Sequence, residues 1–315
     1  MQPCWRRSNH KWFAPGHALR GRPKEVGSRR ERQQGVQKRR KALAGRRVGT
    51  RGRLPGLRGR RRPFAVEWCA GTGSFAGAAQ RYGLCTITVD SDPALEPTHC
   101  VDALKVSAAN LIEWCNGVIP AFLWAGVPCT FMSREQNGRH FSVRGDGTHI
   151  PATAKGRVAV QHIEKVVGVW ETLCHLARRQ GCRVPVLVIE NSFGGDFVHT
   201  VPIRQLLQQA NTNKHVLDYC QYGAAGKWPK KPTALIVVGN VLFKGLRCPG
   251  KAECGHIPWD KYTAYHIDSH EKFVRHSGHC HEKTRRLRGR TPRRLCSAVI
   301  RAWRLGLDGP PTAET

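Results

Sequence analysis

The sequence predicts an α/β fold whose core is a doubly wound, mostly parallel β-sheet, followed by a small irregular C-terminal region. Three observations predict it. Short apolar runs of strand length recur from Phe64 onwards, helical patterns separate them, and glycine-rich or polar segments directly follow several of the runs. Strands that alternate with helices are typical of a sheet covered by helices on both faces, in which ligands bind beyond the carboxyl ends of the strands.

The expected strands are six apolar runs, at 64–68, 85–89, 121–126, 184–190, 215–222 and 233–239. Between the third and fourth runs, apolar residues recur at three- and four-residue spacing over 158–177, which predicts a long helix with Gly181 as its C-cap. A second helix is expected over 201–210. After Asn240 the alternation stops, and a basic amphipathic segment at 291–303 closes the pattern.

Composition limits the class of protein. The chain has 315 residues, 40% of them hydrophobic, which is enough for one substantial core. A net charge of +30 favours a polyanionic partner, with nucleic acid ahead of a membrane surface, and no run of 18 apolar residues or secretory signal is found. Thirteen cysteines, several inside apolar runs, indicate reduced intracellular thiols rather than disulfides. The expected compartment is the nucleus in a eukaryote, or the cytoplasm or nucleoid for a phage or bacterial protein.

Residues 1–62 form a basic arm, with 21 Lys and Arg against two Glu, a net charge of +19. The arm has almost no apolar periodicity and is expected to be disordered on its own. It could tether nucleic acid, direct nuclear import through QKRRK at 37–41, target an organelle, or be a solvated tail without a specific role. After it we expect a catalytic core at 63–240, a region rich in Cys, His and Lys at 241–290, and a closing helix at 291–305 that returns to the core.

The first motif with chemical potential is EWCAGTGSFAG at 67–77, directly after the first expected strand. A strand followed by a Gly-x-Gly turn and a helix lets a nucleoside approach the backbone closely. The next strand ends in Asp90, with Asp92 nearby, and a carboxylate there can accept both hydroxyls of a ribose. Tight turns also use glycine for purely structural reasons, so this motif alone leaves both interpretations open.

The second motif is AGVPCTFMS at 125–133, after the third expected strand. Pro128 fixes the chain just before Cys129, and helical structure is expected to follow. A thiol near a helix N-terminus tends toward a lowered pKa, and the thiolate is the reactive species. The alternative is that Cys129 is a packing residue like most cysteines in apolar surroundings.

The third motif is VIENSFGGD at 188–196, where Glu190 and Asn191 end a strongly apolar strand. A half-buried carboxyl at a strand end can have a raised pKa and donate a proton. The alternative is a helix-capping Asn beside an exposed Glu.

Together the three motifs fit one reaction. Carbon-5 of cytosine is too poor a nucleophile to accept a methyl group unaided, and addition of a thiolate at carbon-6 makes it electron-rich. An acid at ring nitrogen 3 helps the addition by taking up the developing charge. The methyl group then comes from a sulfonium, a base removes the carbon-5 proton, and the thiolate leaves. A base inside duplex DNA must leave the stack to react.

The order of these motifs resembles the cytosine-5 DNA methyltransferase family. EWCAGTGS is similar to its cofactor loop, PCTFMS to its nucleophile loop and IEN to its Glu-Asn strand end. Compact, phage-type members are the most similar in pattern, because YCQYG at 219–223, KKPT at 230–233, Asn240 and TPRRLCSAVI at 291–300 also match. The resemblance covers about residues 64–303.

The resemblance implies a class I (Rossmann-like) methyltransferase fold, S-adenosylmethionine as cofactor and duplex DNA with a flipped cytosine as partner; no protein partner can be inferred. Cys129 would be the nucleophile, Glu190 would hold the cytosine edge, and Asn191 would order that loop. The expected cofactor contacts are Glu67, Trp68, Ala70, Gly71, Gly73, Asp90 and Asp102, with the loop residues at the amino-acid end, Asp90 at the ribose and Asp102 at the adenine amino group. The expected nucleic-acid contacts are Ser133, Lys227, Lys230 and Lys231.

Three departures from the family pattern matter. Cys69 stands where the family usually has a Phe that packs on the cofactor, so Trp68 or another aromatic would have to compensate. Val127 replaces a common Pro. The usual Gln-x-Arg-x-Arg segment is missing, and one of the three lysines would have to serve as the active-site cation, although lysine is a point charge rather than a fork.

Residues 241–290 occupy the place of the family's target-recognition region. Their potential metal ligands are Cys248, Cys254, His256, His266, His270, His279, Cys280 and His281. The spacing CPGKAECGH matches no standard zinc finger, and basic, His-rich loops on phosphates are an equally simple interpretation. No metal ligand is therefore assigned from the sequence.

Two alternative functions stay open. The same chemistry could act on RNA such as tRNA, because the sequence shows no duplex-specific reader. The chain could also be a non-catalytic, basic nucleic-acid-binding protein that retains the fold, with the arm responsible for binding.

Overall fold

The computed structural model describes residues 62–136, 138–223, 228–257 and 290–308. Its main feature is a seven-stranded sheet in the order β3-β2-β1-β4-β7-β9-β8. The strands are β1 (Phe64–Trp68), β2 (Cys85–Asp90), β3 (His99–Cys100), β4 (Phe122–Ala125), β7 (Val186–Ser192), β8 (Thr212–Asp218) and β9 (Pro232–Val238). The pairs from β3 to β7 are parallel, whereas β9 is antiparallel to both of its neighbours. This order with one reversed strand is that of class I S-adenosylmethionine-dependent methyltransferases and confirms the predicted fold class.

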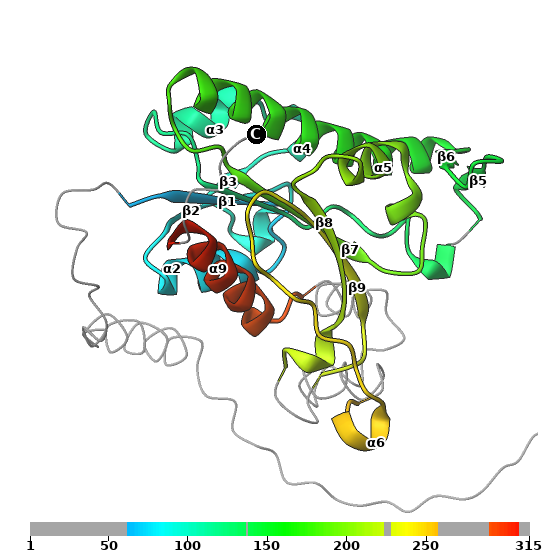
Figure 1. Cartoon of the computed structure of the whole chain (residues 1–315). Helices are drawn as coiled ribbons and strands as arrows, with labels where there is room; N and C mark the ends of the chain where they lie inside the picture. The colour runs from blue at the N-terminus through cyan, green and yellow to red at the C-terminus, as the bar shows by residue number, and fades with distance from the viewer. Residues whose placement is uncertain (1–61, 137, 224–227, 258–289, 309–315) are drawn as a thin grey trace, which may run out of the picture. The chain divides into compact units, whose positions relative to one another are not determined.

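Helices cover both faces of the sheet (Figure 1). On one face lie α3 (Ala108–Trp114), α4 (Ala154–Arg179) and α5 (Val201–Leu207), and on the other lie α2 (Ser74–Arg81) and α9 (Arg293–Asp308). Each face has its own hydrophobic cluster. Because the central strands are buried on both sides, they are apolar along their whole length, which is why the sequence reveals them as continuous runs.

Side-chain alternation along the strands decides which cluster a residue joins. In β1, Val66 and Trp68 point toward the α4 side, whereas Ala65 points toward α2 and α9. In β4, Phe122 and Trp124 stack on Phe75 of α2, with ring centroids 5.1 Å away in both cases. The first helix after the glycine-rich segment is thus fixed to the sheet by aromatic contacts.

The long helix α4 confirms the predicted periodic segment. Thr153 caps its N-terminus, because the Thr153 hydroxyl accepts a hydrogen bond from the Gly156 N–H at 3.2 Å. Its buried positions recur at three- and four-residue spacing. The helix ends at Arg179, and Gly181 beyond it has a φ of +63°, the left-handed conformation that favours glycine after a helix.

Some elements differ from the prediction. The strand expected at 215–222 is β8, which ends at Asp218 and passes into the 3₁₀ turn η5 (Tyr219–Gln221). A two-stranded hairpin, β5 (Phe141–Val143) and β6 (His149–Pro151), was not expected, because three-residue strands leave no periodic signal. The remaining short elements are η1 (Pro93–Leu95), η2 (Ala103–Lys105), η3 (Arg134–Gln136), η4 (Phe197–His199) and α6 (Lys251–Cys254).

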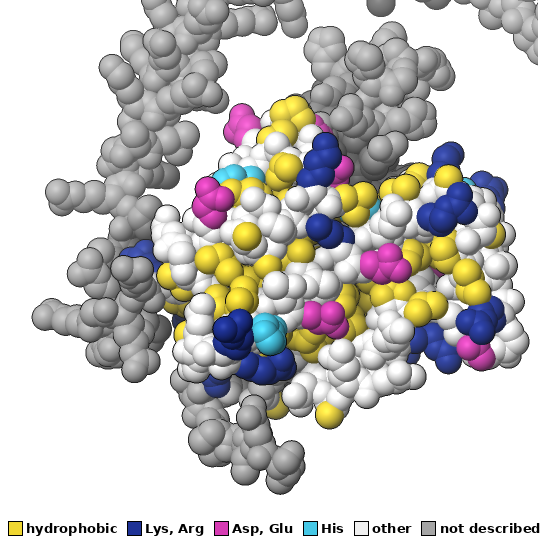
Figure 2. Space-filling model, turned by 90° about the horizontal axis from the view of Figure 1, so that it is seen from above, with side chains coloured by type: hydrophobic (Ala, Val, Ile, Leu, Met, Phe, Trp, Pro, Cys, Tyr) yellow, Lys and Arg dark blue, Asp and Glu magenta, His cyan; other side chains and the backbone are white. Residues whose placement is uncertain are grey.

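Figure 2 shows the face that carries α4, where basic side chains gather toward both ends and hydrophobic side chains lie between them. Within the described ranges, no helix has the length and apolar character needed to cross a membrane. The arm lies outside the described residues except for Arg62, and so does most of 258–290.

Candidate active site at the carboxyl end of the sheet

The glycine-rich loop between β1 and α2 is held by a buried carboxylate. The two oxygens of Glu67 accept hydrogen bonds from the backbone N–H groups of Phe75 and Ala76, at 3.0 and 2.8 Å. These N–H groups belong to the first turn of α2, which has no partner for them within the helix. Burial raises the pKa of Glu67 to about 7, against the lowering effect of the two hydrogen bonds. Glu67 therefore ties the start of α2 to the end of β1.

The loop itself has an unusual backbone. Cys69, Gly71 and Gly73 have φ angles of +54°, +53° and +63°. A Cβ added at Gly71 or Gly73 would meet no atom within 4 Å, so the space above both glycines is open. The left-handed conformation favours glycine there, and the absence of side chains lets another molecule approach the backbone.

Two aspartates that follow or end the neighbouring strands β2 and β3 lie close to this loop. The carboxylate of Asp90, the last residue of β2, accepts the Gly71 N–H at 2.8 Å and the Asp92 N–H at 3.0 Å. Asp102 accepts the Leu104 N–H at 3.0 Å at the start of η2. Both carboxylates lie close enough to Cys69 to raise the pKa of its thiol.

Cys69 is a poor nucleophile. Burial is the main cause that raises the pKa of its thiol to about 12, and the negative charges of Asp90 and Asp102 add to it. The neighbouring Trp68 is fully buried in the core. The sequence left the place of the missing aromatic to Trp68 or another aromatic residue, and the Trp68 side chain lies in the packed cluster beneath α4.

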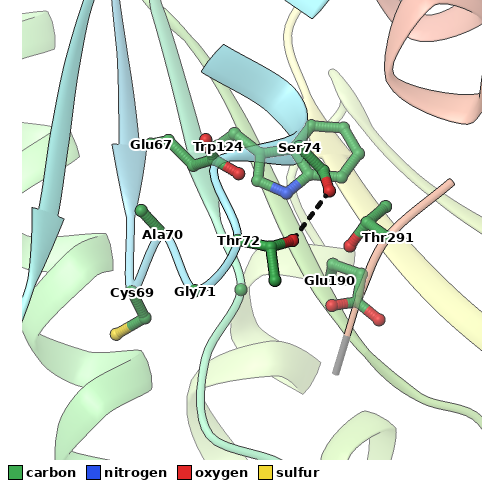
Figure 3. A pocket seen from close by; sticks show the side chains of 10 residues that line it. Glu67, Cys69, Ala70, Gly71, Thr72, Ser74, Trp124, Glu190 and Thr291 are labelled. Carbon is green, nitrogen blue, oxygen red and sulfur yellow. Dashed lines mark hydrogen bonds between the residues drawn. The ribbon is translucent and has the colours of Figure 1, made fainter. Parts of the chain in front are cut away.

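A small pocket lies between the glycine-rich loop and residues at the carboxyl ends of β4 and β7 (Figure 3). It is lined by Glu67, Cys69, Ala70, Gly71, Thr72, Ser74, Trp124, Gly126, Glu190 and Thr291. The figure shows Glu190 and Thr291 beside each other, across from the loop residues. The structure thus brings the first and third sequence motifs to one cavity, although they are more than a hundred residues apart.

Glu190 lies near the end of β7 and is 7% exposed. Its Oε1 accepts a hydrogen bond from the Tyr219 hydroxyl at 2.7 Å and lies 3.7 Å from the Lys231 Nζ. Within the described part of the chain, no hydrogen bond to its Oε2 is found, so that oxygen is left for a ligand. Burial, with the Glu190 charge, raises the pKa of Tyr219 well above its ordinary value. Tyr219 therefore stays a phenol that donates to the carboxylate.

Lys231, one of the three lysines expected to serve as the active-site cation, lies beside both Glu190 and Tyr219. The Lys231 Nζ also lies 4.7 Å from the centroid of the Tyr219 ring, and its side chain is 12% exposed. The Tyr219 hydroxyl reaches the Thr291 Oγ1 at 3.4 Å, which links the end of β8 to the segment before α9. By contrast, Lys230 is exposed, and Lys227 lies outside the described residues.

Asn191 ties the Glu-Asn strand end to the Pro-Cys loop. Its buried side-chain amide donates to the Val127 carbonyl at 3.1 Å, two residues before Cys129, while its Oδ1 accepts the Ser192 N–H at 2.8 Å. Cys129 is half-buried and does not contribute to the hydrophobic clusters of the described residues. Cys129 does not line the pocket. The residue of this loop that does is Gly126, three residues earlier.

The helix expected directly after Cys129 is not formed. A turn follows instead, in which the Met132 N–H donates to the Cys129 carbonyl at 3.1 Å, and η3 begins only at Arg134. The Met132 carbonyl accepts the Asp196 N–H at 2.9 Å, so it is committed to the loop after β7. A Cβ at Gly195 would lie 2.0 Å from that carbonyl, which shows how closely the two loops pack. Ser133 is half-buried in the same turn.

The sequence predictions missed the roles of Tyr219 and Thr291. Both lie in segments that were quoted for the family resemblance, YCQYG and TPRRLCSAVI. The available signal was position, because Tyr219 follows the end of a strand and Thr291 precedes the closing helix. Their partners are 29 and 72 residues away, so pattern alone could not pair them.

No protein-family model and no curated protein matches the sequence. Among solved structures, the Dnmt2 methyltransferase of S. pombe is 13% identical with a TM-score of 0.38 over 59% of this chain and 52% of that one. The Entamoeba histolytica methyltransferase EhMeth is 11% identical with a TM-score of 0.39, over 57% and 53%. A Spodoptera frugiperda DNMT2 mutant is 13% identical with a TM-score of 0.37, over 60% and 56%.

The chain thus spans about half the length of the solved structures it matches. At such low identities and TM-scores, the similarity carries no information on chemistry. The activity of this chain has to be inferred from its own side chains.

Proposed function

We propose that this chain is a methyltransferase that uses S-adenosylmethionine to methylate carbon-5 of cytosine in DNA. The observation that carries the proposal is the junction of three motifs at one edge of the sheet. Glu190 shares a pocket with the glycine-rich loop, and its neighbour Asn191 is hydrogen-bonded to the loop that carries Cys129. A packing cysteine and a capping asparagine would not require this arrangement.

The residues of the loop fit the cofactor. S-adenosylmethionine supplies, when bound, the electrophilic methyl group on its sulfonium. We assign its amino-acid end to Ala70, Gly71 and Gly73, above which the space is open. The half-exposed carboxylate of Asp90, already oriented by two backbone N–H groups, has lone pairs left for the ribose hydroxyls. Asp102 is assigned to the adenine amino group.

Glu67 and Trp68 take indirect roles in this proposal. Glu67 fixes the first turn of α2 and lines the pocket floor, so it shapes the cofactor site. Trp68 belongs to the core and is not retained as a contact. The apolar packing that an aromatic side chain would give the cofactor is left to the half-buried Cys69 side chain.

The chemistry then follows from Cys129 and Glu190. The Cys129 thiolate adds to carbon-6 of the flipped cytosine. Glu190, once its carboxylate has taken up a proton on Oε2, protonates nitrogen 3 as the ring gains electrons. The bound cofactor would supply the methyl group to carbon-5. A base would then remove the carbon-5 proton, Glu190 would take back the nitrogen-3 proton, and the thiolate would leave as the double bond re-forms. Tyr219 and Lys231 hold Oε1 of Glu190 in place, so that Oε2 faces the ring. Ser133, Lys227 and Lys230 are assigned to the nucleic acid.

Transfer of a radioactive methyl group tests the proposal. The full chain is incubated with labelled S-adenosylmethionine and either duplex DNA or tRNA, and the labelled base is identified after digestion. The expected result is 5-methylcytosine in DNA with the wild-type protein and with Cys182→Ser, whose thiol is exposed on a distant turn, and none with Cys129→Ser. Label in tRNA alone would assign the same chemistry to RNA. A folded protein that binds the cofactor yet labels neither substrate would identify a non-catalytic binding protein.

A further inference from the structure

Four side chains with soft donor atoms meet beside the candidate active site, outside the pocket. They are Cys220 in η5, Cys248 in the segment before α6, Cys254 at the end of α6, and His256 two residues beyond Cys254. One donor atom from each lies within 4.8 Å of all the others, and the Cys248 Sγ lies 3.4 Å from the His256 Nδ1. The sequence suggested three of these residues as possible ligands but gave no reason to join Cys220 to them.

The donor set and its dimensions suit a tetrahedral zinc ion. Zinc binds thiolate sulfur at ~2.3 Å and imidazole nitrogen at ~2.0 Å, so the donors around one ion are roughly 3.5 to 3.8 Å apart. The cluster needs only a small contraction to reach these separations. Three thiolates and one imidazole fill four coordination positions, which is typical of a structural site rather than a catalytic one with an open position.

A second layer of contacts orients the ligands. The Gln221 side-chain amide donates to the Cys254 Sγ at 3.1 Å and to the Cys220 Sγ at 3.9 Å. Such N–H donors stabilise the negative charge of metal-bound thiolates. The fully buried Asp218 carboxylate accepts the Cys248 N–H at 2.8 Å and the Arg247 Nε–H at 2.9 Å. The ligand-bearing turn at 246–248 is thereby fixed to the end of β8.

Helix α6, which carries Cys254, is short and exposed. Helix α6 has only four residues, and its side chains at 251–253 are exposed. A helix of one turn is not stable alone, because nucleation costs more than a single hydrogen bond returns. It lies between Gly250 and Gly255, both at positive φ. A cross-link between this segment and η5 would fix it, and bound metal is a common cross-link in small segments without a core.

We propose that Cys220, Cys248, Cys254 and His256 bind one structural Zn²⁺ ion. The ion joins the segment at 246–256 to the end of β8. It also acts on the active site, because Cys220 is adjacent to Tyr219, whose hydroxyl holds Glu190 at 2.7 Å and whose N–H donates to the Lys231 carbonyl at 3.2 Å. The zinc site thus helps to position Tyr219, and through it Glu190, at the pocket. This assignment stands whether or not the chain methylates nucleic acid.

Metal content tests the proposal directly. The full chain is purified under reducing conditions without added chelator, and zinc is measured by mass spectrometry. One equivalent is expected in the wild type and in Cys182→Ser, and less than a tenth of an equivalent in Cys248→Ser and Cys254→Ser. His256→Cys is expected to keep one equivalent, because it offers a fourth thiolate. Reduced, monodisperse wild-type protein without zinc, or Cys248→Ser with a full equivalent, would overturn the assignment.

Cobalt provides a readout that does not depend on whether the serine variants fold. Co²⁺ exchanged into the wild-type chain is expected to give the intense visible bands of tetrahedral coordination and a thiolate-to-cobalt charge-transfer band. The charge-transfer band should grow by about a third in His256→Cys, as the number of thiolates rises from three to four. Weak octahedral bands without charge transfer, or a spectrum unchanged in His256→Cys, would contradict the ligand set. A disulfide between two of these cysteines that persists under the reducing conditions of purification would contradict it as well.

Discussion

The two sides of the candidate site are built in different ways. On the cofactor side, carboxylates bind backbone N–H groups, as Glu67 does with the start of α2 and Asp90 with Gly71, 19 residues earlier in the chain. On the base side, side chains bind one another across long stretches of sequence, as Tyr219 does with Glu190 and Thr291. The contacts of Glu67 with the start of α2 lie within the one short motif at 67–77, so that motif can encode them. The base side exists only after β7, β8, β9 and the segment before α9 have come together.

This difference predicts that variants on the two sides separate cofactor binding from catalysis. Cys129 and Cys69, both half-buried, give the largest contrast. Cys129→Ser is expected to reduce methyl transfer at least ~10³-fold without weakening cofactor binding, because a hydroxyl cannot replace the thiolate. Cys69→Ser is expected to retain most of the turnover, because its thiol, with a pKa near 12, takes no part in the chemistry. Single-turnover rates and cofactor titrations measure both effects, and equal losses in the two variants would contradict the assignment.

The buried carboxyl of Glu67 predicts a pH-dependent stability on the cofactor side. Its pKa is raised from 4.5 to about 7 in the folded chain, so the folded state holds the proton more tightly than the unfolded state. The stability that this group contributes is present below pH 4.5 and is lost as the pH rises to 7. The loss amounts to at most ~3 kcal/mol.

Glu67→Gln is therefore expected to flatten the dependence of the free energy of unfolding on pH between 4.5 and 7. Denaturant titrations at several pH values measure the slope. A variant with the same slope as the wild type would show that another group is responsible.

Tyr219→Phe and Asp90→Asn form the next pair, one on each side. Loss of the Tyr219 hydroxyl removes a hydrogen bond to a charged group, worth ~1.5–3 kcal/mol, and should lower kcat about 10- to 100-fold with the cofactor Kd unchanged. Asp90→Asn should weaken cofactor binding, because a charged acceptor for the ribose is lost. Titration calorimetry and kcat measurements distinguish the two variants. A changed cofactor Kd in Tyr219→Phe would contradict the prediction that Tyr219 affects catalysis and not cofactor binding.

The adjacent lysines provide the finest comparison. Lys231 lies 3.7 Å from Glu190 and is almost buried, whereas Lys230 is exposed. Lys231→Met is expected to lower kcat about tenfold through Glu190. Lys230→Met should leave kcat unchanged and act only on nucleic-acid affinity, with a smaller salt dependence. Equal effects on kcat would mean that neither lysine acts through the buried carboxylate.

The same contrast explains what the sequence could predict. The strands and α4 were predictable because burial on both faces or on one face leaves a continuous or periodic apolar pattern. The glycine-rich loop, the Pro-Cys loop and the Glu-Asn pair were predictable because each follows a strand end, where a parallel sheet collects its ligands. The burial of Trp68 follows from the alternation of β1, since Val66 and Trp68 share one face.

Other features of the site could not be predicted from the sequence. The turn directly after Cys129 packs on the loop after β7, where the Met132 carbonyl accepts the N–H of Asp196, 64 residues further along the chain. Cys220 joins the other three proposed zinc ligands across 27 residues of intervening sequence, and no standard finger spacing marks it. Contacts of this kind depend on the arrangement of complete strands, so a local pattern does not contain them.

A covalent trap tests whether Cys129 forms a bond to the cytosine ring. DNA that carries 5-fluorocytosine is incubated with the full chain and S-adenosylmethionine, and the adduct is digested and located by mass spectrometry. Because fluorine at carbon-5 cannot be removed as a proton is, the sulfur–carbon bond cannot be released. The account predicts one nucleotide-linked peptide, joined through Cys129 and missing in Cys129→Ser. A wild-type protein that binds this DNA and the cofactor but forms no adduct, or one joined through another cysteine, would contradict it.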